Sequence, residues 1–335
     1  MSAPVEAPRA TVVVATRNRA HLLPRLVAAL EAQEGPPPFE VVVVDDASTD
    51  QTPAVLAALA ASSLAAGSLD LRVERQDVRG GQSAGRDRGW RTARGDLVLF
   101  TDDDCVPRPG WVAGLVGALD EVDLVQGRTV PAPDQAGHDG PFSRTLEVTE
   151  ANGTYATCNM GYRRSWLDKV DGFDVRYRHL AGEDTDLALR CRELGATFAF
   201  TDDAVVEHDV RPSSFVAALK GTWRWQTLPT TLRRHPDLAS AFHGRYVWRE
   251  SHVPTAPAVL GTAAGLGLAL RRRPRLGLTV AALAGLPYAS YRLRRAPVTL
   301  DKPRRIALLP ATFVVDGAEV LVLLAGSARA RRLLL

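Results

Sequence analysis

Cysteine is scarce in this sequence of 335 residues. The three cysteines, Cys105, Cys158 and Cys191, lie far apart, lack the close spacing of zinc ligands, and leave one residue over in any disulfide scheme. We therefore expect a reducing, cytosolic setting rather than a secreted, disulfide-bonded protein. The first ten residues also lack the apolar run of a secretory signal peptide, so we expect no such peptide there.

Charge is balanced overall but unevenly distributed. The net charge is +3, yet residues 1–270 hold 28 Lys and Arg against 35 Asp and Glu, whereas residues 271–335 hold 13 against 3. A basic tail suits either nucleic acid or an anionic membrane surface. Aromatic residues that could stack on bases are few in the tail and its apolar stretches are long, so we expect a membrane surface and no nucleic acid as partner.

Uncharged runs and helical patterns alternate along the first hundred residues. Strands are predicted at 11–15, 40–44, 69–73 and 97–100, and helices at 22–31, at 53–61 with Thr52 as N-cap, and from Gly80 onwards. Later strands are predicted at 123–126, 197–200 and 204–206, and helices from Trp166 and from Gly182 to Leu194. This alternation predicts an α/β fold with a mostly parallel sheet flanked by helices.

Polar side chains gather where the predicted strands end. Asn18 follows the first strand, Asp45 and Asp46 end the second, and Asp102 to Asp104 end the fourth. Ligands of parallel α/β sheets bind beyond the carboxyl ends of the strands. We therefore expect one shared site at that edge.

Three consecutive carboxylates at 102–104 repel one another unless a cation lies between them. Hard oxygen ligands of this kind suit Mg²⁺ or Mn²⁺. Strand alternation would turn Asp102 and Asp104 to one side and Asp103 to the other. The alternative interpretation is a helix N-cap or a solvated turn, where Asp is also common.

Six motifs occur in an order that resembles the family 2 glycosyltransferases, which have the GT-A nucleotide-diphospho-sugar-binding fold. They cover residues 10–215 and are Thr16-Arg17-Asn18-Arg19, Val44 through Asp50, Gly81 through Arg86 with Gly89, Gly95-Asp96 with Phe100 through Asp104, Asn159-Met160, and Gly182 through Leu187. The resemblance implies inverting transfer of a sugar from a UDP- or GDP-sugar donor to a carbohydrate or lipid-linked acceptor, helped by a divalent metal.

The resemblance assigns the nucleotide to the first two strand ends. Asp45 would hydrogen-bond the base with Asp46 beside it, and Thr16 and Asn18 would line the same pocket. An Asx turn with an N-cap is the alternative for the two acids. Arg86 would approach the donor phosphates, or else be a solvated surface arginine. The glycines before it are not a P-loop, because the Lys-Ser/Thr ending is missing.

The metal and the donor share the acidic motif in this family. Asp102 and Asp104 match its two acids, with Asp104 holding the metal, and we place Asp103 beside the donor with Asp102. The metal would neutralise charge on the leaving diphosphate. His208 would add a further metal contact, although a lone histidine after a strand is often structural.

Acceptor chemistry is assigned to the second half of the catalytic region. Asp184 would take the proton from the acceptor hydroxyl, with Glu183 next to it and Asp186 in a supporting position. Asn159 and Trp166 would border the acceptor pocket. The alternative for Glu183 and Asp184 is a charged helix start favoured by the helix dipole.

The pattern changes after residue 215. We predict a catalytic domain at 1–215, a connecting and acceptor-side segment at 216–252, and an apolar, arginine-rich helical tail at 253–335. Arg224-Trp225 lacks the glutamine that completes the Gln-x-x-Arg-Trp motif of processive synthases, which argues against processive polymerisation.

The tail contains three apolar stretches. Residues 253–270 and 276–291 are uncharged, and residues 306–328 carry only Asp316 and Glu319, which share a helical face. We expect helices that lie in the interface at the cytoplasmic face of a membrane or form a shallow hairpin, with arginines on anionic lipid. A soluble helical subdomain is the alternative.

Two other kinds of protein remain open at this point. One is a nucleotidyltransferase of similar fold, although 16–19 is not the Gly-rich basic signature expected of it. The other is a non-catalytic sugar-nucleotide-binding protein, which the loss of Asp184 or of the metal acids would favour; all of them are present.

Overall fold

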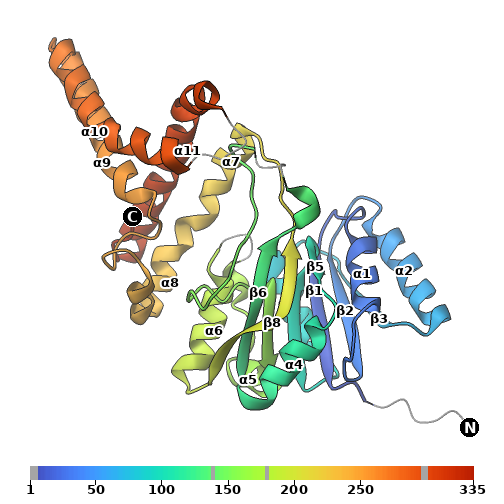
Figure 1. Cartoon of the computed structure of the whole chain (residues 1–335). Helices are drawn as coiled ribbons and strands as arrows, with labels where there is room; N and C mark the ends of the chain where they lie inside the picture. The colour runs from blue at the N-terminus through green and yellow to red at the C-terminus, as the bar shows by residue number, and fades with distance from the viewer. Residues whose placement is uncertain (1–6, 137–139, 178–180, 296–300) are drawn as a thin grey trace, which may run out of the picture. The chain divides into compact units, whose positions relative to one another are not determined.

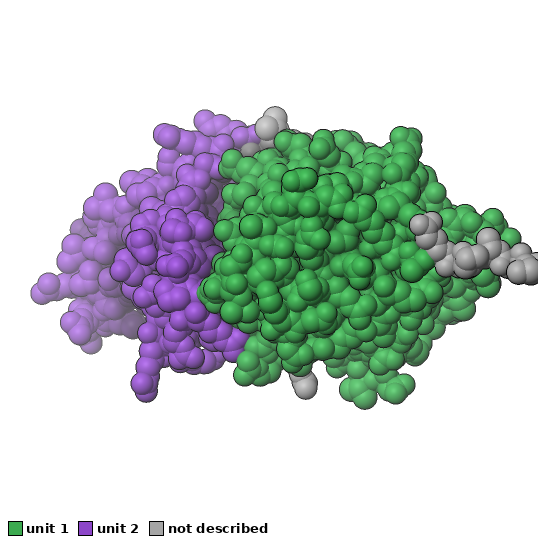
Figure 2. Space-filling model, turned by 90° about the horizontal axis from the view of Figure 1, so that it is seen from below, with its two compact units in different colours: residues 1–136, 145–209 green, residues 137–144, 210–335 purple. Residues whose placement is uncertain are grey.

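The computed structural model describes residues 7–136, 140–177, 181–295 and 301–335. The chain forms two compact units, coloured separately in Figure 2. Unit 1 comprises residues 1–136 and 145–209, and unit 2 comprises residues 137–144 and 210–335. The domain boundary predicted at residue 215 therefore lies six residues inside unit 2. The grouping of residues 137–144 with the later residues was not predicted.

Unit 1 is built on one mixed sheet (Figure 1). Within the described residues its strand order is β3-β2-β1-β4-β7-β6-β8-β5. The strands are β1 Ala10–Thr16, β2 Phe39–Asp46, β3 Asp70–Gln76, β4 Leu97–Asp102, β5 Cys105–Pro107, β6 Leu124–Pro131, β7 Asn159–Arg163 and β8 Phe198–His208. The four predicted strands β1 to β4 pair in parallel, whereas β7 runs antiparallel to both β4 and β6.

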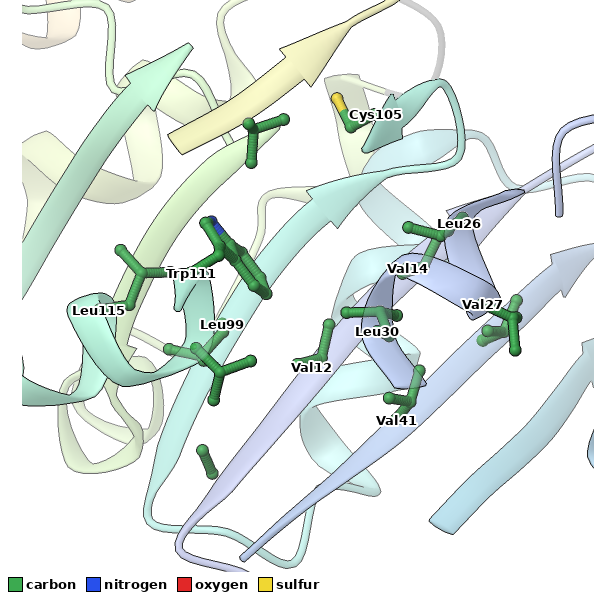
Figure 3. Close-up of a cluster of buried hydrophobic side chains, with 14 of the residues drawn as sticks. Val12, Val14, Leu26, Val27, Leu30, Val41, Leu99, Cys105, Trp111 and Leu115 are labelled. Atoms are coloured by element: carbon green, nitrogen blue, oxygen red, sulfur yellow. The ribbon is translucent and has the colours of Figure 1, made fainter. Parts of the chain in front are cut away.

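Helices cover both faces of this sheet. They are α1 Leu23–Glu31, α2 Thr52–Ala66, α3 Gln82–Arg91, α4 Trp111–Glu121, α5 Arg164–Lys169 and α6 Glu183–Glu193. Successive strand residues point to opposite faces, so Val12 and Val14 join one core with α1, α2 and α4, while Val13 joins a second core with α3, α5 and α6. Figure 3 shows part of the first core around Val12, Leu30 and Trp111.

Helix α3 lies close to the sheet at two of its residues, which are glycines. A Cβ at Gly89 would lie 2.4 Å from Val13 Cγ1, and one at Gly85 would lie 2.9 Å from Ala15 Cβ. These glycines, which the sequence grouped with the donor motif, therefore set the distance between helix and sheet. That distance places Arg86 above the strand ends.

Several local details differ from the sequence predictions, and helix α4 and strand β5 were not predicted at all. Thr52 is the first residue of α2 rather than its N-cap; the Asp50 side chain accepts the Thr52 N–H at 2.9 Å. The Thr52 hydroxyl instead accepts the Arg19 N–H at 2.9 Å. The two strands predicted at 197–200 and 204–206 are one continuous strand, β8, which tolerates the intervening acids because they are exposed.

Unit 2 is mainly helical in its described residues. Its α-helices are α7 Phe215–Gly221, α8 Leu228–Arg234, α9 His252–Leu270, α10 Pro274–Arg295 and α11 Lys302–Ala330. By length and composition, α9 and α11 are able to cross a membrane. The two acids of α11 share a face and are buried within the unit: Asp316 accepts Tyr288 Oη at 2.8 Å and Arg292 Nε at 2.7 Å, and Glu319 pairs with Arg249 at 3.2 Å.

Candidate active site

The polar strand ends meet at one edge of the unit 1 sheet. In the parallel register Thr16 lies opposite Asp45, and Ala15 lies opposite Asp102. The residues that follow β1, β2 and β4 therefore emerge side by side. A ligand at this edge would contact three loops that are distant in sequence.

Asp45 and Asp46 fix the loops around them. Asp45 is buried, and it accepts the Ser48 N–H at 2.9 Å and Arg75 Nη1 at 3.0 Å. Asp46 accepts the N–H groups of Gly80 and Gly81 at 2.6 and 2.9 Å. The Asx-turn interpretation thus describes part of what Asp45 does, and a nucleoside at Asp45 would have to share the carboxylate with Arg75.

Thr16 and Asn18 tie the same loops together. The Thr16 hydroxyl donates to Asp103 Oδ2 at 2.8 Å. Asn18 has φ = 53°, a left-handed conformation that asparagine tolerates better than most residues. Its backbone N–H donates to Ser48 Oγ, and its side-chain oxygen accepts the Thr49 N–H at 2.8 Å. These hydrogen bonds hold the loops after β1 and β2 together.

The three consecutive carboxylates do not follow strand alternation. Strand β4 ends at Asp102, and Asp103 and Asp104 form a tight turn before β5. Asp102 accepts a hydrogen bond from Arg86 Nη2, and Asp103 accepts one from the Thr16 hydroxyl. Asp104 faces His208, with its Oδ2 3.8 Å from His208 Nε2. The prediction that Asp102 and Asp104 point the same way assumed a strand that the turn interrupts.

A candidate metal centre lies beside this turn. One ligand atom each from Asp104, Cys105 and His208 lies within 4.8 Å of the others. His208 Nδ1 is 2.9 Å from the Asp209 carbonyl, which can only accept, so Nδ1 carries a proton; in the neutral imidazole Nε2 would then offer a lone pair on the side of Asp104. A carboxylate and a neutral imidazole fit Mn²⁺ well.

Cys105 was not anticipated at this centre. It enters because β5 pairs with β8, which sets Cys105 opposite His208. Burial, together with the neighbouring Cys158 thiol, holds the pKa of Cys105 well above its ordinary value. A protonated thiol is a weak ligand, so Asp104 and His208 are the better candidates for holding a metal.

Arg86 is the most heavily engaged side chain of the site. Its buried guanidinium donates to Asp102 Oδ1 at 2.6 Å, to Asp184 Oδ1 at 3.1 Å and to Glu183 Oε1 at 3.4 Å. Burial opposes the positive charge, but the three carboxylates outweigh it and raise the pKa of Arg86 above its ordinary value. The surface-arginine alternative is therefore wrong.

Asp184 is the second residue of α6 and has two hydrogen-bond partners. Besides Arg86, the backbone N–H of Thr157 donates to its Oδ2 at 3.1 Å. The neighbouring Glu183 is more deeply buried. Asp186 is buried between Arg190 Nε at 2.9 Å and Tyr177 Oη at 3.5 Å, which gives it a structural place in α6.

The two residues predicted to border the acceptor, Asn159 and Trp166, lie in different surroundings. Asn159 is fully buried; its amide nitrogen donates to the carbonyls of Arg128 and Ala204, and its oxygen accepts Trp111 Nε1 at 2.8 Å. It braces strands and helix α4 inside the core, contrary to the expected pocket position. Trp166 is partly buried on α5, with Lys169 Nζ 3.7 Å from its ring centroid.

Two further contacts at the site were not predicted from the sequence. Arg75 reaches Asp45 because β2 and β3 pair those two residues directly. The Thr157 N–H reaches Asp184 across 27 residues of chain. Neither residue lies in a motif, so only the pairing of distant segments brings it to the site.

Solved structures with a similar fold cover nearly the whole chain. A mannosyltransferase of Pyrobaculum calidifontis, PcManGT, in complex with GDP-Man and Mn²⁺, superposes with a TM-score of 0.60 at 22% identity, over 94% of this chain and 87% of that one. TarS of S. aureus, residues 1–349 in complex with UDP, gives 0.51 at 19% identity, over 97% and 92%. These likenesses show the GT-A-like α/β fold.

Curated relatives match about two thirds of the chain. A pre-mycofactocin glycosyltransferase of Mycobacterium tuberculosis is 29% identical over 247 residues, which cover 68% of this chain and 48% of that protein. A chondroitin synthase of Pasteurella multocida is 27% identical over 60% of this chain and 25% of its own length. This chain therefore spans between a quarter and a half of these two relatives.

One family model matches the unit 1 sequence directly. The model described as glycosyl transferase family 2 aligns with residues 11–182, just over half of the chain. That range runs from strand β1 to the start of α6 and includes Asp45, Arg86 and the acids at 102–104. The chain belongs to glycosyl transferase family 2.

Proposed function

We propose that this chain transfers a sugar, with inversion, from a UDP- or GDP-sugar to a carbohydrate or lipid-linked acceptor. The observation that carries the proposal is the single buried guanidinium of Arg86, which joins an acid of the strand-end motif, Asp102, to the acid at the start of α6, Asp184. A donor-side and an acceptor-side carboxylate thereby share one cluster. Family membership, and relatives named as glycosyltransferases and synthases, support the same activity.

The donor nucleotide is assigned to the edge formed by the loops after β1 and β2. Thr16 and Asn18 would line the nucleoside pocket, and Asp45 would accept a hydrogen bond from the base. Asp46 holds the 80–81 turn that begins α3 and so supports this wall indirectly. Binding of GDP-Man by PcManGT and of UDP by TarS makes both nucleotides reasonable candidates.

A divalent metal, Mn²⁺ or Mg²⁺, fits beside the diphosphate. Asp104 and the lone pair on His208 Nε2 would hold it, with phosphate oxygens and water as the other ligands. When bound, it would neutralise negative charge on the departing diphosphate. PcManGT was solved with Mn²⁺.

Asp184 is the proposed general base. It would accept the proton of the acceptor hydroxyl as that oxygen bonds the anomeric carbon and the bond from that carbon to the diphosphate oxygen breaks. Attack on the face opposite the diphosphate inverts the configuration. Arg86 and the Thr157 N–H orient the two carboxylate oxygens, so Arg86 acts as a positioning residue rather than a phosphate ligand.

We place this activity at the cytoplasmic face of a membrane, with unit 2 as the attachment. The long apolar helices α9 and α11 and the basic composition of residues 210–335 support that location. A lipid-linked acceptor would be delivered at the same surface.

A donor screen tests the proposed activity. Purified full-length protein is heated with UDP, GDP and other nucleotides, each with Mn²⁺ or with EDTA, and then assayed for sugar release from the stabilising donor. We expect one nucleotide to raise the melting temperature only with Mn²⁺, followed by release of the free nucleoside diphosphate. Absence of stabilisation by any nucleotide, or stabilisation without turnover across a panel of acceptors, would contradict the proposal.

A further inference from the structure

Helices α9 and α10 of unit 2 form an antiparallel hairpin (Figure 1). Gly261 of α9 meets Ala284 of α10, and Gly265, one turn nearer the connecting segment, meets Gly277. The connecting segment is Arg271–Arg273, a run of three arginines. The hairpin is thus a two-helix element with a basic tip.

The seam between these helices consists of the smallest side chains. A Cβ at Gly265 would lie 2.5 Å from the Gly277 carbonyl oxygen, one at Gly277 would lie 2.3 Å from the Gly265 carbonyl oxygen, and one at Gly261 would lie 2.1 Å from Ala284 Cβ. Only glycine permits such close approach of two backbones. Helices pack in this way where lipid, being as apolar as leucine, provides no hydrophobic drive for burying large side chains.

The large apolar side chains of the hairpin face outward. Leu260 is 69% exposed and Leu283 is 64% exposed. The other exposed leucines of the two helices are Leu266, Leu270, Leu276, Leu278 and Leu286. A helix at the surface of a water-soluble protein shows the opposite pattern, with an apolar stripe inside and charges outside.

Charge is confined to the two ends of the hairpin. Arginines 271, 272, 273 and 275 lie at the tip, and arginines 292, 294 and 295 lie at the base, with no Asp or Glu anywhere between residues 251 and 300. The uncharged stretch of α9, residues 253–270, extends about 27 Å at 1.5 Å per residue, close to the roughly 30 Å hydrocarbon core of a bilayer. The tip arginines complement anionic headgroups, whereas at the base Arg292 pairs with Asp316 and Arg295 pairs with Glu250.

We propose that the α9–α10 hairpin spans the hydrocarbon core of an anionic bilayer, with α10 crossing as the packed partner of α9, although among the described helices only α9 and α11 qualify as spans by their own length and composition. Its glycine seam lies inside, its leucines contact lipid, and its two groups of arginines reach opposite headgroup layers. This rests on the membrane location proposed above and is independent of sugar transfer. It replaces the expectation of helices lying in the interface, because such helices need a broad polar face and neither stretch has one.

The orientation follows from the number of basic residues on each side. The tip carries four arginines, whereas the segment leaving the base carries six basic residues before α11 becomes apolar: Arg292, Arg294, Arg295, Lys302, Arg304 and Arg305. The side with more Lys and Arg stays cytoplasmic. The base therefore stays on the cytoplasmic side and the tip crosses. Helix α11 differs from the hairpin, since it turns Asp316 and Glu319 inward to form ion pairs.

Depth-dependent quenching tests the proposal on the full-length chain. Single cysteines replace Leu260, Leu270 and Leu283 in separate variants, and a fluorophore is attached; Cys105, Cys158 and Cys191 are all buried and stay unlabelled. The probe membrane is a vesicle of phosphatidylglycerol and phosphatidylethanolamine with quenchers at the bilayer centre or near the headgroup. We expect the centre quencher to act most on positions 260 and 283, and the headgroup quencher most on 270. Leu194→Cys in unit 1, 59% exposed, is the control and stays unquenched.

Three results would overturn the proposal. Shallow quenching at all three positions would mean that the hairpin lies on the surface. Depth that increases steadily to position 270 would mean partial insertion. If the full chain is recovered in water without detergent and does not bind vesicles, the hairpin belongs to a soluble subdomain. Nucleotide binding by unit 1, measured in the same samples, separates each failure from a failure of the proposed activity.

A charge variant gives an independent measurement. Leu283→Glu puts a carboxylate at mid-depth, and we expect vesicle binding to fall by about 10²-fold, given the known cost of a charge at the bilayer centre. The matched Leu194→Glu change on unit 1 should leave binding unaltered. Equal behaviour of the two variants would contradict insertion.

Discussion

The two units use opposite arrangements of charge and apolar surface. Unit 1 holds 20 Lys and Arg against 32 Asp and Glu, whereas unit 2 holds 21 against 6. Unit 1 buries valine and leucine beneath its helices and keeps a small number of charges inside, around Arg86 and Glu40. The hairpin of unit 2 instead exposes its leucines and keeps glycine inside.

Each arrangement follows from the proposed surroundings. In water, apolar area removed from solvent is the main source of stability, so unit 1 has two layered cores. In lipid that source disappears between helices and close backbone packing replaces it, which accounts for a glycine seam. Glycine permits close approach in both units: Gly89 lets α3 contact β1, and Gly265 lets α9 contact α10.

The largest expected effect comes from Asp184→Asn in unit 1. The amide keeps the size of the side chain but cannot take a proton, so we expect the transfer rate to fall by about 10²–10⁴-fold. Donor affinity and vesicle binding should stay at wild-type values, because the donor and unit 2 are assigned elsewhere. The exposed Asp168→Asn on α5 is the control. A transfer rate within about threefold of wild type would exclude Asp184 as the base and shift attention to Glu183.

The second effect concerns the metal. Asp104→Ala removes a proposed ligand, and we expect the Mn²⁺-dependent part of donor affinity to fall by at least about 10–100-fold, the range found even for residues that only support metal ligands. Calorimetric titration with and without Mn²⁺ measures it. Asp202→Ala, at an exposed acid of the same unit, should have no effect. Unchanged Mn²⁺ dependence in Asp104→Ala would rule out this centre.

The third effect is on the stability of unit 1 and depends on pH. Burial raises the pKa of Glu40, but the Arg94 N–H, Arg72, Thr11 and the Arg94 side chain together lower it below the ordinary 4.5. A lowered pKa stabilises the fold above about pH 4.5, and this stabilisation is lost as pH falls through the folded-state value. We expect Glu40→Gln to cost about 1.5–3 kcal/mol at pH 7.

Urea unfolding at two pH values measures this difference. The gap between wild type and Glu40→Gln should be full at pH 7 and should shrink toward pH 3. A gap that stays constant with pH would show that packing, rather than the ionised carboxylate, accounts for the loss.

The smallest effect separates the roles of two helical glycines. Gly89→Ala forces a methyl to within 2.4 Å of Val13 Cγ1, so we expect a loss of about 1–3 kcal/mol and lower activity as α3 and Arg86 shift. Gly117→Ala on α4 has open space, so a gain of up to about 1 kcal/mol is expected there. Thermal unfolding measures both variants. Equal shifts in their melting temperatures would contradict the role of Gly89 in setting the distance between α3 and the sheet.

Much of unit 1 was predictable because local patterns determine strands and helices. Valine runs such as 12–14 and 41–44 become buried strands wherever they lie in the chain, and strands alternating with helices leave polar residues at one sheet edge. The shared face of Asp316 and Glu319 was equally predictable, since it depends only on spacing within one helix, whereas their burial against Arg292 and Arg249 was not.

Partners from distant segments were decided by tertiary structure alone. Arg86 meets Asp184 across 98 residues, Arg75 meets Asp45 through strand register, and Cys105 comes beside His208 because β5 pairs with β8. Asn159 was expected from the sequence to border the acceptor pocket, yet β7 turns it into the core. Periodicity within a segment shows which residues are buried, whereas the partner of a polar side chain depends on which segments the sheet places next to each other.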